Sequence, residues 1–158
     1  MRLYDLHKLI SISSGPAPQA IFHNLRSLAL NGCKLKYLFT IDVAQYLLLL
    51  EDLWLQNCYK LEGVIESREE TVNNKMIIFP ELKSLHLQDL PHMKWFCSPT
   101  KSATNPKDTE CPSLQHLYMR DCPHLSLTAS DFNTRNPVQI NNEKQRSSMY
   151  KRLWDSGK

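Results

Sequence analysis

The sequence predicts an α/β fold built from stacked repeats, and two observations support this class. In residues 79–96, apolar residues recur at intervals of two and three, a spacing that fits neither an amphipathic helix nor a simple strand. In addition, the unit apolar-x-x-Leu-x-x-Leu-x-Leu, with Met as its last residue in one copy, recurs along the 158-residue chain. Recurrence of one short unit is the sequence signature of a repeat architecture.

Four complete copies of the unit follow an incomplete one. Inside Leu-x-Leu the period of two indicates a β-strand whose alternate side chains face the core, and the period of three on either side indicates corners. Residues 3–12 align with the second half of the third complete copy, so residues 1–3 are expected to end a repeat whose beginning is absent. The complete copies begin near Phe22, Leu47, Phe79 and Cys111.

The unit is that of leucine-rich repeats, and it predicts a solenoid. Short parallel β-strands would line its concave face, with irregular loops and short helices on its convex face. A single repeat cannot bury its apolar edge, whereas stacked repeats share one continuous core. We expect the leucine-rich-repeat domain over 1–127 and a polar C-terminal tail over 128–158. Apolar residues in that tail have helical spacing and would form a cap on the last repeat: Met149, Tyr150, Leu153 and Trp154.

The segments between the strands have their own expected structures. Residues 40–50 read as a short helix with Asp42 near its start, and residues 66–75 and 98–110 read as polar, turn-rich loops. One position after the strands holds a cysteine in three repeats and a leucine in the others. A buried thiol there would act as a small plug that donates weakly to backbone carbonyls. The residues at this position are Leu6, Cys33, Cys58, Leu90 and Cys122.

Composition excludes several classes of partner and compartment. The formal net charge is +3 with scattered Lys and Arg, which does not predict a nucleic-acid partner. The longest apolar run contains Glu51 and Asp52 and is too short for a membrane span. The chain shows no signal-peptide pattern and no Asn-x-Ser/Thr acceptor, and its five cysteines fit a reducing compartment. We therefore expect a cytoplasmic, intracellular protein.

Neither a metal site nor a catalytic site is predicted, and no cofactor. Cys111, His116, Cys122 and His124 lie close in sequence, but the repeat assigns both cysteines to the core, His116 to the concave face and His124 to a turn. No Cys-x-x-Cys pair is present, although structural zinc sites usually have close ligand pairs. The nucleophile-elbow motif Gly-x-Ser-x-Gly is also absent. We expect the protein not to be an enzyme.

A second possible catalytic grouping lies along one strand edge. Ser84, His86 and Asp89 would be brought near one another there, but the sequence offers no partner for an oxyanion. This grouping therefore does not change the expectation of a non-enzymatic protein.

The candidate binding surface consists of side chains that flank the strand leucines and form three columns on the concave face. The central column would place aromatic rings side by side on strands about 4.8 Å apart. Trp, Tyr and Arg dominate binding energy at protein interfaces when exposed, but neighbouring rings can also simply stack on one another. The predicted protein-binding residues are Asp52 and His116 in the first column, Trp54, His86 and Tyr118 in the central column, and Gln56, Gln88 and Arg120 in the third.

Residues 38–66 and 79–98 resemble the C-terminal leucine-rich-repeat region of plant disease resistance proteins of the coiled-coil, nucleotide-binding, leucine-rich-repeat (CC-NBS-LRR) family. Residues 139–155 are similar to a degraded form of that family's ending, in which a Gly-Glu and a Trp-Trp pair precede Leu-x-Trp. Asn142-Glu143 and Met149-Tyr150 stand at the places of the two pairs.

The resemblance implies a protein-interaction arm in plant defence and innate immunity. By this likeness the concave face would recognise a pathogen effector or a guarded host protein. The same arm would hold a nucleotide-binding (NB-ARC) module inactive, in cis or in trans. This chain lacks Gly-x-x-x-x-Gly-Lys-[Ser/Thr], so we expect the nucleotide switch to lie outside it.

Three other interpretations remain. One is the substrate-recognition arm of a ubiquitin ligase, which would need an F-box-like helical segment before the repeats. Another is a fragment of an extracellular receptor, against which the missing signal peptide and glycosylation acceptors argue. The last is a truncated receptor fragment without a function of its own, because an open first repeat would expose unpaired backbone.

Overall fold

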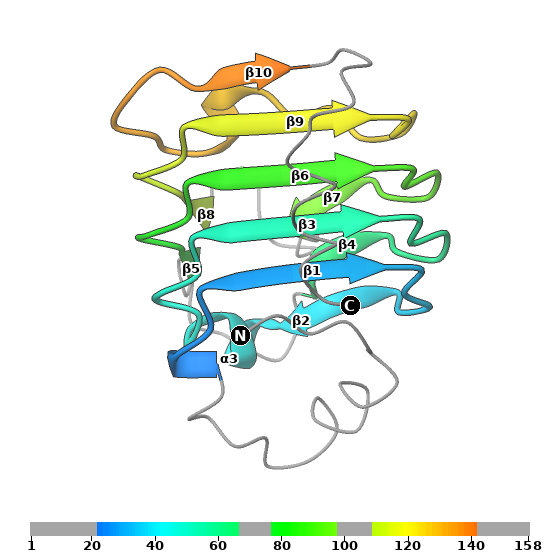
Figure 1. Ribbon diagram of the computed structural model, residues 1–158, viewed down its shortest axis with the longest axis horizontal. Helices are drawn as coiled ribbons and strands as arrows, with labels where there is room; N and C mark the ends of the chain where they lie inside the picture. Colours follow the sequence, from blue (N-terminus) through cyan, green and yellow to red (C-terminus); the bar gives the residue numbers. More distant parts are fainter. Residues whose placement is uncertain (1–21, 67–76, 98–108, 142–158) are drawn as a thin grey trace, which may run out of the picture.

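The structure is a computed structural model that describes residues 22–66, 77–97 and 109–141 (Figure 1). Its main feature is a five-stranded parallel sheet in the order β1-β3-β6-β9-β10. Four of these strands come from the first halves of the four complete repeats, which therefore lie beside one another in sequence order. The strands are β1 (Ser27–Asn31), β3 (Asp52–Gln56), β6 (Ser84–Gln88), β9 (His116–Arg120) and β10 (Gln139–Asn141).

The strand register matches the alignment of the repeats. Leu28 pairs with Leu53, Leu53 with Leu85, and Leu85 with Leu117. The next inward residues, Leu30, Leu55, Leu87 and Met119, pair in the same way. Because side chains alternate along a strand, this register places the leucines of all four repeats on one face. The repeat alignment predicted from the spacing of the leucines is confirmed.

The second halves of the repeats, and the segments between repeats, also form short strands. A three-stranded parallel sheet joins the first, second and third repeats, and a two-stranded sheet joins the segments that precede the third and fourth. The pattern of single apolar residues at the corners did not predict these short strands. They are β2 (Tyr37–Thr40), β4 (Gly63–Glu66) and β7 (Trp95–Cys97) in the first of these sheets, and β5 (Ile77–Ile78) and β8 (Thr109–Glu110) in the second.

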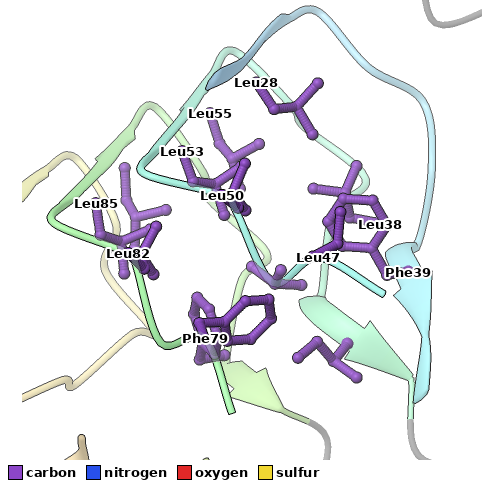
Figure 2. Packing of buried hydrophobic residues seen from close by; sticks show 14 of the residues in the cluster. Leu28, Leu38, Phe39, Leu47, Leu50, Leu53, Leu55, Phe79, Leu82 and Leu85 are labelled. Atoms are coloured by element: carbon purple, nitrogen blue, oxygen red, sulfur yellow. The ribbon is translucent and has the colours of Figure 1, made fainter. Parts of the chain in front are cut away.

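The core lies between the five-stranded sheet and the second halves of the repeats. Leu28, Leu53 and Leu85 enter it from the five-stranded sheet, while Leu38 and Phe39 enter it from β2 (Figure 2). Every apolar position of the four repeat units is buried except Met119, which is partly buried. A fully buried leucine contributes about 1.5–3 kcal/mol. Stacking the repeats therefore stabilises the fold chiefly through this continuous row of leucines.

Each of the first four strands of the five-stranded sheet is followed at once by a residue in the left-handed backbone region. Glycine, asparagine and aspartate adopt this region more readily than other residues, because glycine has no Cβ and the short Asn and Asp side chains bond locally. The chain turns sharply there and enters the second half of the repeat. The four residues and their φ angles are Gly32 at 73°, Asn57 at 54°, Asp89 at 52° and Asp121 at 53°.

Helix is scarce among the described residues. The helix expected over residues 40–50 is present as α3 (Ile41–Ala44), with Asp42 in its first turn, and residues 45–50 form turns instead. A short 3-10 helix, η1 (Ala129–Asp131), follows the fourth repeat. No described helix has the length and apolar character needed to cross a membrane.

The C-terminal segment contains structure that the leucine pattern did not indicate. β10 lies within residues 128–158, which the sequence assigned to a polar tail, and it pairs in parallel with β9. Phe132, just after η1, is 2% exposed and packs edge-on against Phe96 with ring centroids 5.4 Å apart. The expected partial repeat over 1–21 and the expected cap at 149–154 lie outside the described residues. The part of the chain that is described is an α/β repeat fold with parallel strands.

Candidate protein-binding face

The side chains between the strand leucines form the surface of the five-stranded sheet that faces away from the core. We call this surface the outer face. Because alternate residues point to opposite sides, burying the leucines turns the residues between them to this face. The register aligns them in three columns, as predicted. The first column is Ser27, Asp52, Ser84 and His116; the central column is Ala29, Trp54, His86 and Tyr118; the third column is Asn31, Gln56, Gln88 and Arg120.

The central column is a stack of rings. The Trp54 and His86 rings are nearly parallel, with centroids 3.6 Å apart and an angle of 9° between planes. Tyr118 continues the column beyond His86, with a centroid distance of 5.6 Å and a tilt of 32°. The register brings these rings together because their strands are hydrogen-bonded neighbours.

The expected exposure of the central aromatic residues is wrong. Trp54 is 6% exposed and Tyr118 is 7% exposed, whereas a contact residue that reaches into solvent would be far more open. Stacking explains part of this burial, since each ring covers a face that its neighbour would otherwise present to water. The polar residues of the flanking columns are more open, and His116 is exposed.

His86 has the most perturbed electrostatic environment of the outer face. Its Nδ1 atom is buried and has no hydrogen-bond partner. Burial between the neighbouring rings, and to a lesser extent the nearby His116, lowers the pKa of His86 to about 4. The imidazole is therefore neutral near pH 7, and the centre of the outer face carries no charge from it.

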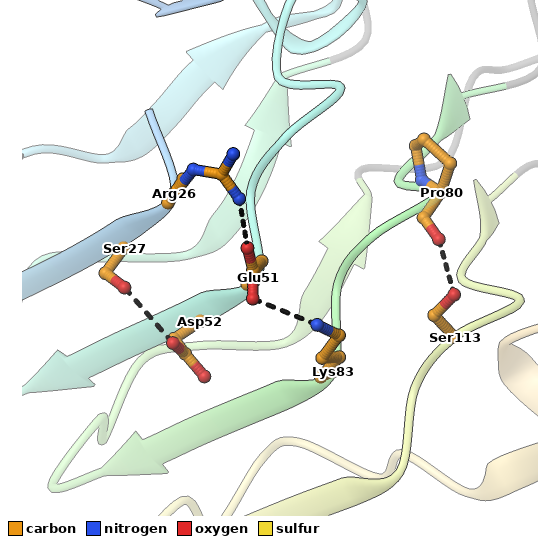
Figure 3. A network of polar contacts seen from close by, with 7 residues as sticks. All are labelled: Arg26, Ser27, Glu51, Asp52, Pro80, Lys83 and Ser113. Atoms are coloured by element: carbon orange, nitrogen blue, oxygen red, sulfur yellow. Dashed lines mark hydrogen bonds and ion pairs between the residues drawn. The ribbon is translucent and has the colours of Figure 1, made fainter. Parts of the chain in front are cut away.

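Ionic contacts tie the strands together at the edge where they begin (Figure 3). Glu51 accepts a hydrogen bond from Arg26 Nη1 at 2.6 Å and another from Lys83 Nζ at 3.0 Å. One carboxylate therefore bridges three successive repeats. The hydrogen bond from Lys83, followed by that from Arg26, lowers the pKa of Glu51. Beside it, Ser27 Oγ donates to Asp52 Oδ2 at 3.1 Å in the first column. These contacts are accessible to water, so they position side chains more than they stabilise the fold.

A polar network holds the third column at the opposite edge. Gln88 Nε2 donates to Asp89 Oδ2 at 2.9 Å, and Arg120 Nε donates to Asp121 Oδ2 at 3.1 Å. The two aspartates are turn residues in the left-handed region, so the turn also orients the binding candidates Gln88 and Arg120. We did not predict this role from the sequence. The sequence feature that could have indicated it is a Gly, Asn or Asp two residues after the last apolar residue of each repeat unit.

The outer face offers contact chemistry. No group of three or more His, Cys, Asp or Glu side chains suited to a metal ion occurs within the described ranges. Cys111 is buried in the core, while His116 and His124 are exposed, as the repeat assignment predicted for all three. His86 Nδ1 has no hydrogen bond to either Ser84 or Asp89. What this face provides is a row of amide, carboxylate, imidazole and guanidinium groups beside a stack of rings.

Comparisons with known proteins agree with this geometry. The family described as plant disease resistance protein RPS2-like, leucine-rich repeats, matches residues 1–131, which is most of the chain. Searches of the curated proteins and of the solved structures found no match. With its parallel strands in register and its aligned leucines, the chain belongs to the leucine-rich-repeat family of plant disease resistance proteins.

Proposed function

We propose that the chain is the recognition arm of a plant immune receptor and that the outer face is the surface by which it binds another protein. In this proposal the complete chain forms a leucine-rich-repeat solenoid and the outer face lies on its concave side. The partner is a pathogen effector or a host protein. The observation that carries the proposal is the outer face itself, where three columns of side chains run in register across four strands.

Both the ring stack and the polar columns suit this role. Asp52, Gln56, Gln88, His116 and Arg120 supply hydrogen-bonding and charged groups at half-buried or exposed positions. Several of these side chains are already held by neighbours, so less conformational entropy is lost when a partner binds. The stack of Trp54, His86 and Tyr118 lies between them as a rigid, largely buried centre that fixes the positions of the two flanking columns.

The second part of the proposal concerns regulation. We infer that a nucleotide-binding module competes for the same face, in cis or in trans, and is held inactive while it is bound. A recognised protein then releases the module only if it binds the arm with enough differential affinity to shift that equilibrium. The five free thiols suit an intracellular setting, because a reducing compartment keeps cysteines unpaired.

Binding measurements on variants of the outer face test the proposal. The probe is a purified nucleotide-binding module from a receptor of this family, titrated into the full chain by calorimetry. Arg120→Ala and Gln88→Ala remove polar groups of the third column without opening the leucine core, and together they should weaken binding about tenfold or more. Trp54→Phe keeps a ring in the stack but removes the indole N–H, and a smaller loss is expected.

The matched control lies away from the outer face. Tyr59 is 60% exposed in the turn after β3, so Tyr59→Ala removes a large apolar side chain without touching the three columns. It should bind like the unaltered chain. Equal affinities for the Arg120, Gln88 and Tyr59 variants, all shown to be folded by circular dichroism, would contradict the outer face as the binding surface.

A further inference from the structure

Two cysteines occupy the same position in neighbouring repeats. Cys33 and Cys58 each follow the left-handed turn residue after a strand, Gly32 in the first repeat and Asn57 in the second. The register continues into these turns, since Gly32 N donates to the Gln56 carbonyl at 2.9 Å and Asn57 Nδ2 donates to Asn31 Oδ1 at 2.8 Å. The two cysteines are therefore lateral neighbours.

The two thiols are buried together at the edge of the core. Cys33 is 5% exposed and Cys58 is 0% exposed. The Cys58 sulfur lies 3.4 Å from the Gln56 carbonyl oxygen. The proximity of the two thiols lowers the pKa of Cys33 and, together with burial, raises the pKa of Cys58. Within the pair, Cys33 is the better thiolate and Cys58 retains its proton.

The fourth repeat provides a contrast within the same chain. Cys122 stands at the equivalent position after β9, but the third repeat has Leu90 there, so the position beside Cys122 holds no thiol. Its sulfur instead lies 3.3 Å from the Arg120 carbonyl oxygen and 3.6 Å from that of Leu87. Cys111 is buried elsewhere in the core, and burial raises its pKa to about 12.

The spacing of the first two repeats suits a covalent bond. Neighbouring strands lie about 4.7–4.9 Å apart, and disulfides join residues whose Cα atoms are roughly 4.4–6.8 Å apart. We propose that Cys33 and Cys58 form an oxidation site, at which a peroxide joins the first and second repeats through a disulfide bond. This inference is independent of what the outer face binds.

The chemistry balances with hydrogen peroxide as the only oxidant. The Cys33 thiolate attacks one peroxide oxygen, the O–O bond breaks, and the products are a sulfenic acid on Cys33 and, after protonation, one water. The Cys58 sulfur then attacks the Cys33 sulfur, releasing a second water and forming the S–S bond. Two thiols are oxidised by two electrons, and one peroxide is reduced to two waters. A dithiol reductant reverses the reaction.

Peptide mapping of the full chain tests the site. The reduced protein is treated with hydrogen peroxide under native conditions, remaining thiols are blocked with N-ethylmaleimide, and trypsin is added without reductant. Cleavage after Lys and Arg places Cys33 in peptide 27–34 and Cys58 in peptide 37–60. These peptides should appear joined, with two hydrogens fewer than their summed masses, and should separate when dithiothreitol is added.

Variants make the test decisive. Cys33→Ser should abolish the joined peptides, whereas Cys122→Ser should leave their yield unchanged, because the position beside Cys122 holds Leu90. If Cys33→Ser does not fold, Cys33→Ala at the same buried position replaces it. Joined peptides containing Cys97, Cys111 or Cys122 in comparable yield would overturn the proposal. So would a Cys33–Cys58 link that forms only after denaturation, or unlinked Cys33 and Cys58 after peroxide treatment of the folded protein.

Discussion

The imidazole of His86 lies flat against the indole of Trp54, with ring centroids 3.6 Å apart and planes 9° apart. Stacking of this kind keeps His86 away from water and leaves its buried Nδ1 without a hydrogen bond. Because a buried imidazole resists protonation, its pKa falls to about 4 from an ordinary value of 6.5. Because the stack lowers this pKa, it makes the free energy of unfolding depend on pH.

The first prediction is that stability falls between pH 6.5 and pH 4 because of His86. Well above pH 6.5 the residue is neutral in both folded and unfolded chains, so it adds no pH dependence there. As pH falls toward 4 the unfolded chain takes up the proton first, which lowers the free energy of unfolding by up to about 3 kcal/mol. Urea unfolding measured across this range checks the slope.

The variant His86→Phe should keep a stacked ring and lose that part of the slope. His92 lies exposed in a turn, so His92→Gln serves as its control and should retain the slope of the unaltered chain. If His86→Phe and the unaltered chain lose stability in parallel as pH falls, the burial of His86 is not the cause.

The second prediction concerns Gly63, which lies between two aromatic residues. A Cβ at this position would come within 3.2 Å of both the Trp95 carbonyl oxygen and the Tyr37 ring. The carbonyl belongs to the paired strand β7 and cannot move freely, so Gly63→Ala should cost about 1–3 kcal/mol in unfolding free energy. Replacing Tyr37 by Val in the same chain should recover part of that loss, because it removes one of the two close contacts.

Gly32 is the matched comparison, because its cost has a different origin. Nothing lies within 4 Å of a Cβ at Gly32, but its φ of +73° is unfavourable for alanine. Gly32→Ala should therefore cost about 1–2 kcal/mol, while Gly32→Asn should cost less. Chemical denaturation of these four variants, and of Gly32→Ala combined with Tyr37→Val, tests this. If Tyr37→Val also restored stability to Gly32→Ala, the steric origin at Gly63 and the backbone origin at Gly32 would not be separate.

The third prediction tests the turn after the strands. Asn57 has φ of 54°, so Asn57→Gly should be tolerated, whereas the β-branched Asn57→Val should cost about 1–2 kcal/mol. Gln56→Val, one residue earlier in the extended strand β3, is the control, since valine favours strands. Equal destabilisation by the two valine substitutions, in urea unfolding, would argue against a backbone origin.

The fourth prediction concerns the end of the described stack. Phe132 is 2% exposed and contacts Phe96 of the third repeat, so Phe132→Ala should open a cavity that costs about 3–5 kcal/mol. The neighbouring Asn133 is exposed, and Asn133→Ala should change stability by less than about 0.5 kcal/mol. A loss below about 1 kcal/mol for Phe132→Ala in thermal or urea unfolding would mean that the segment after η1 does not close the core.

Much of the outer face followed from sequence spacing, because Leu-x-Leu determines which residues alternate toward the core. Once Leu53, Leu85 and Leu117 were aligned, Trp54, His86 and Tyr118 had to be neighbours, and the register confirms it. The spacing did not predict how closely the rings would stack, or how little of them would remain exposed to solvent. Trp54 and Tyr118 were expected to be open and are buried, since stacking depends on side-chain positions that the strand period does not encode.

Local periodicity was enough to predict the repeat, the strand register and the three columns. The short strands between the Leu-x-Leu strands, and the places of Phe132 and β10, could be read only from the folded chain. These depend on which segments meet across the stack. Short strands such as β5 and β8 carry too few residues to show a period, and each exists because its neighbour supplies the hydrogen bonds.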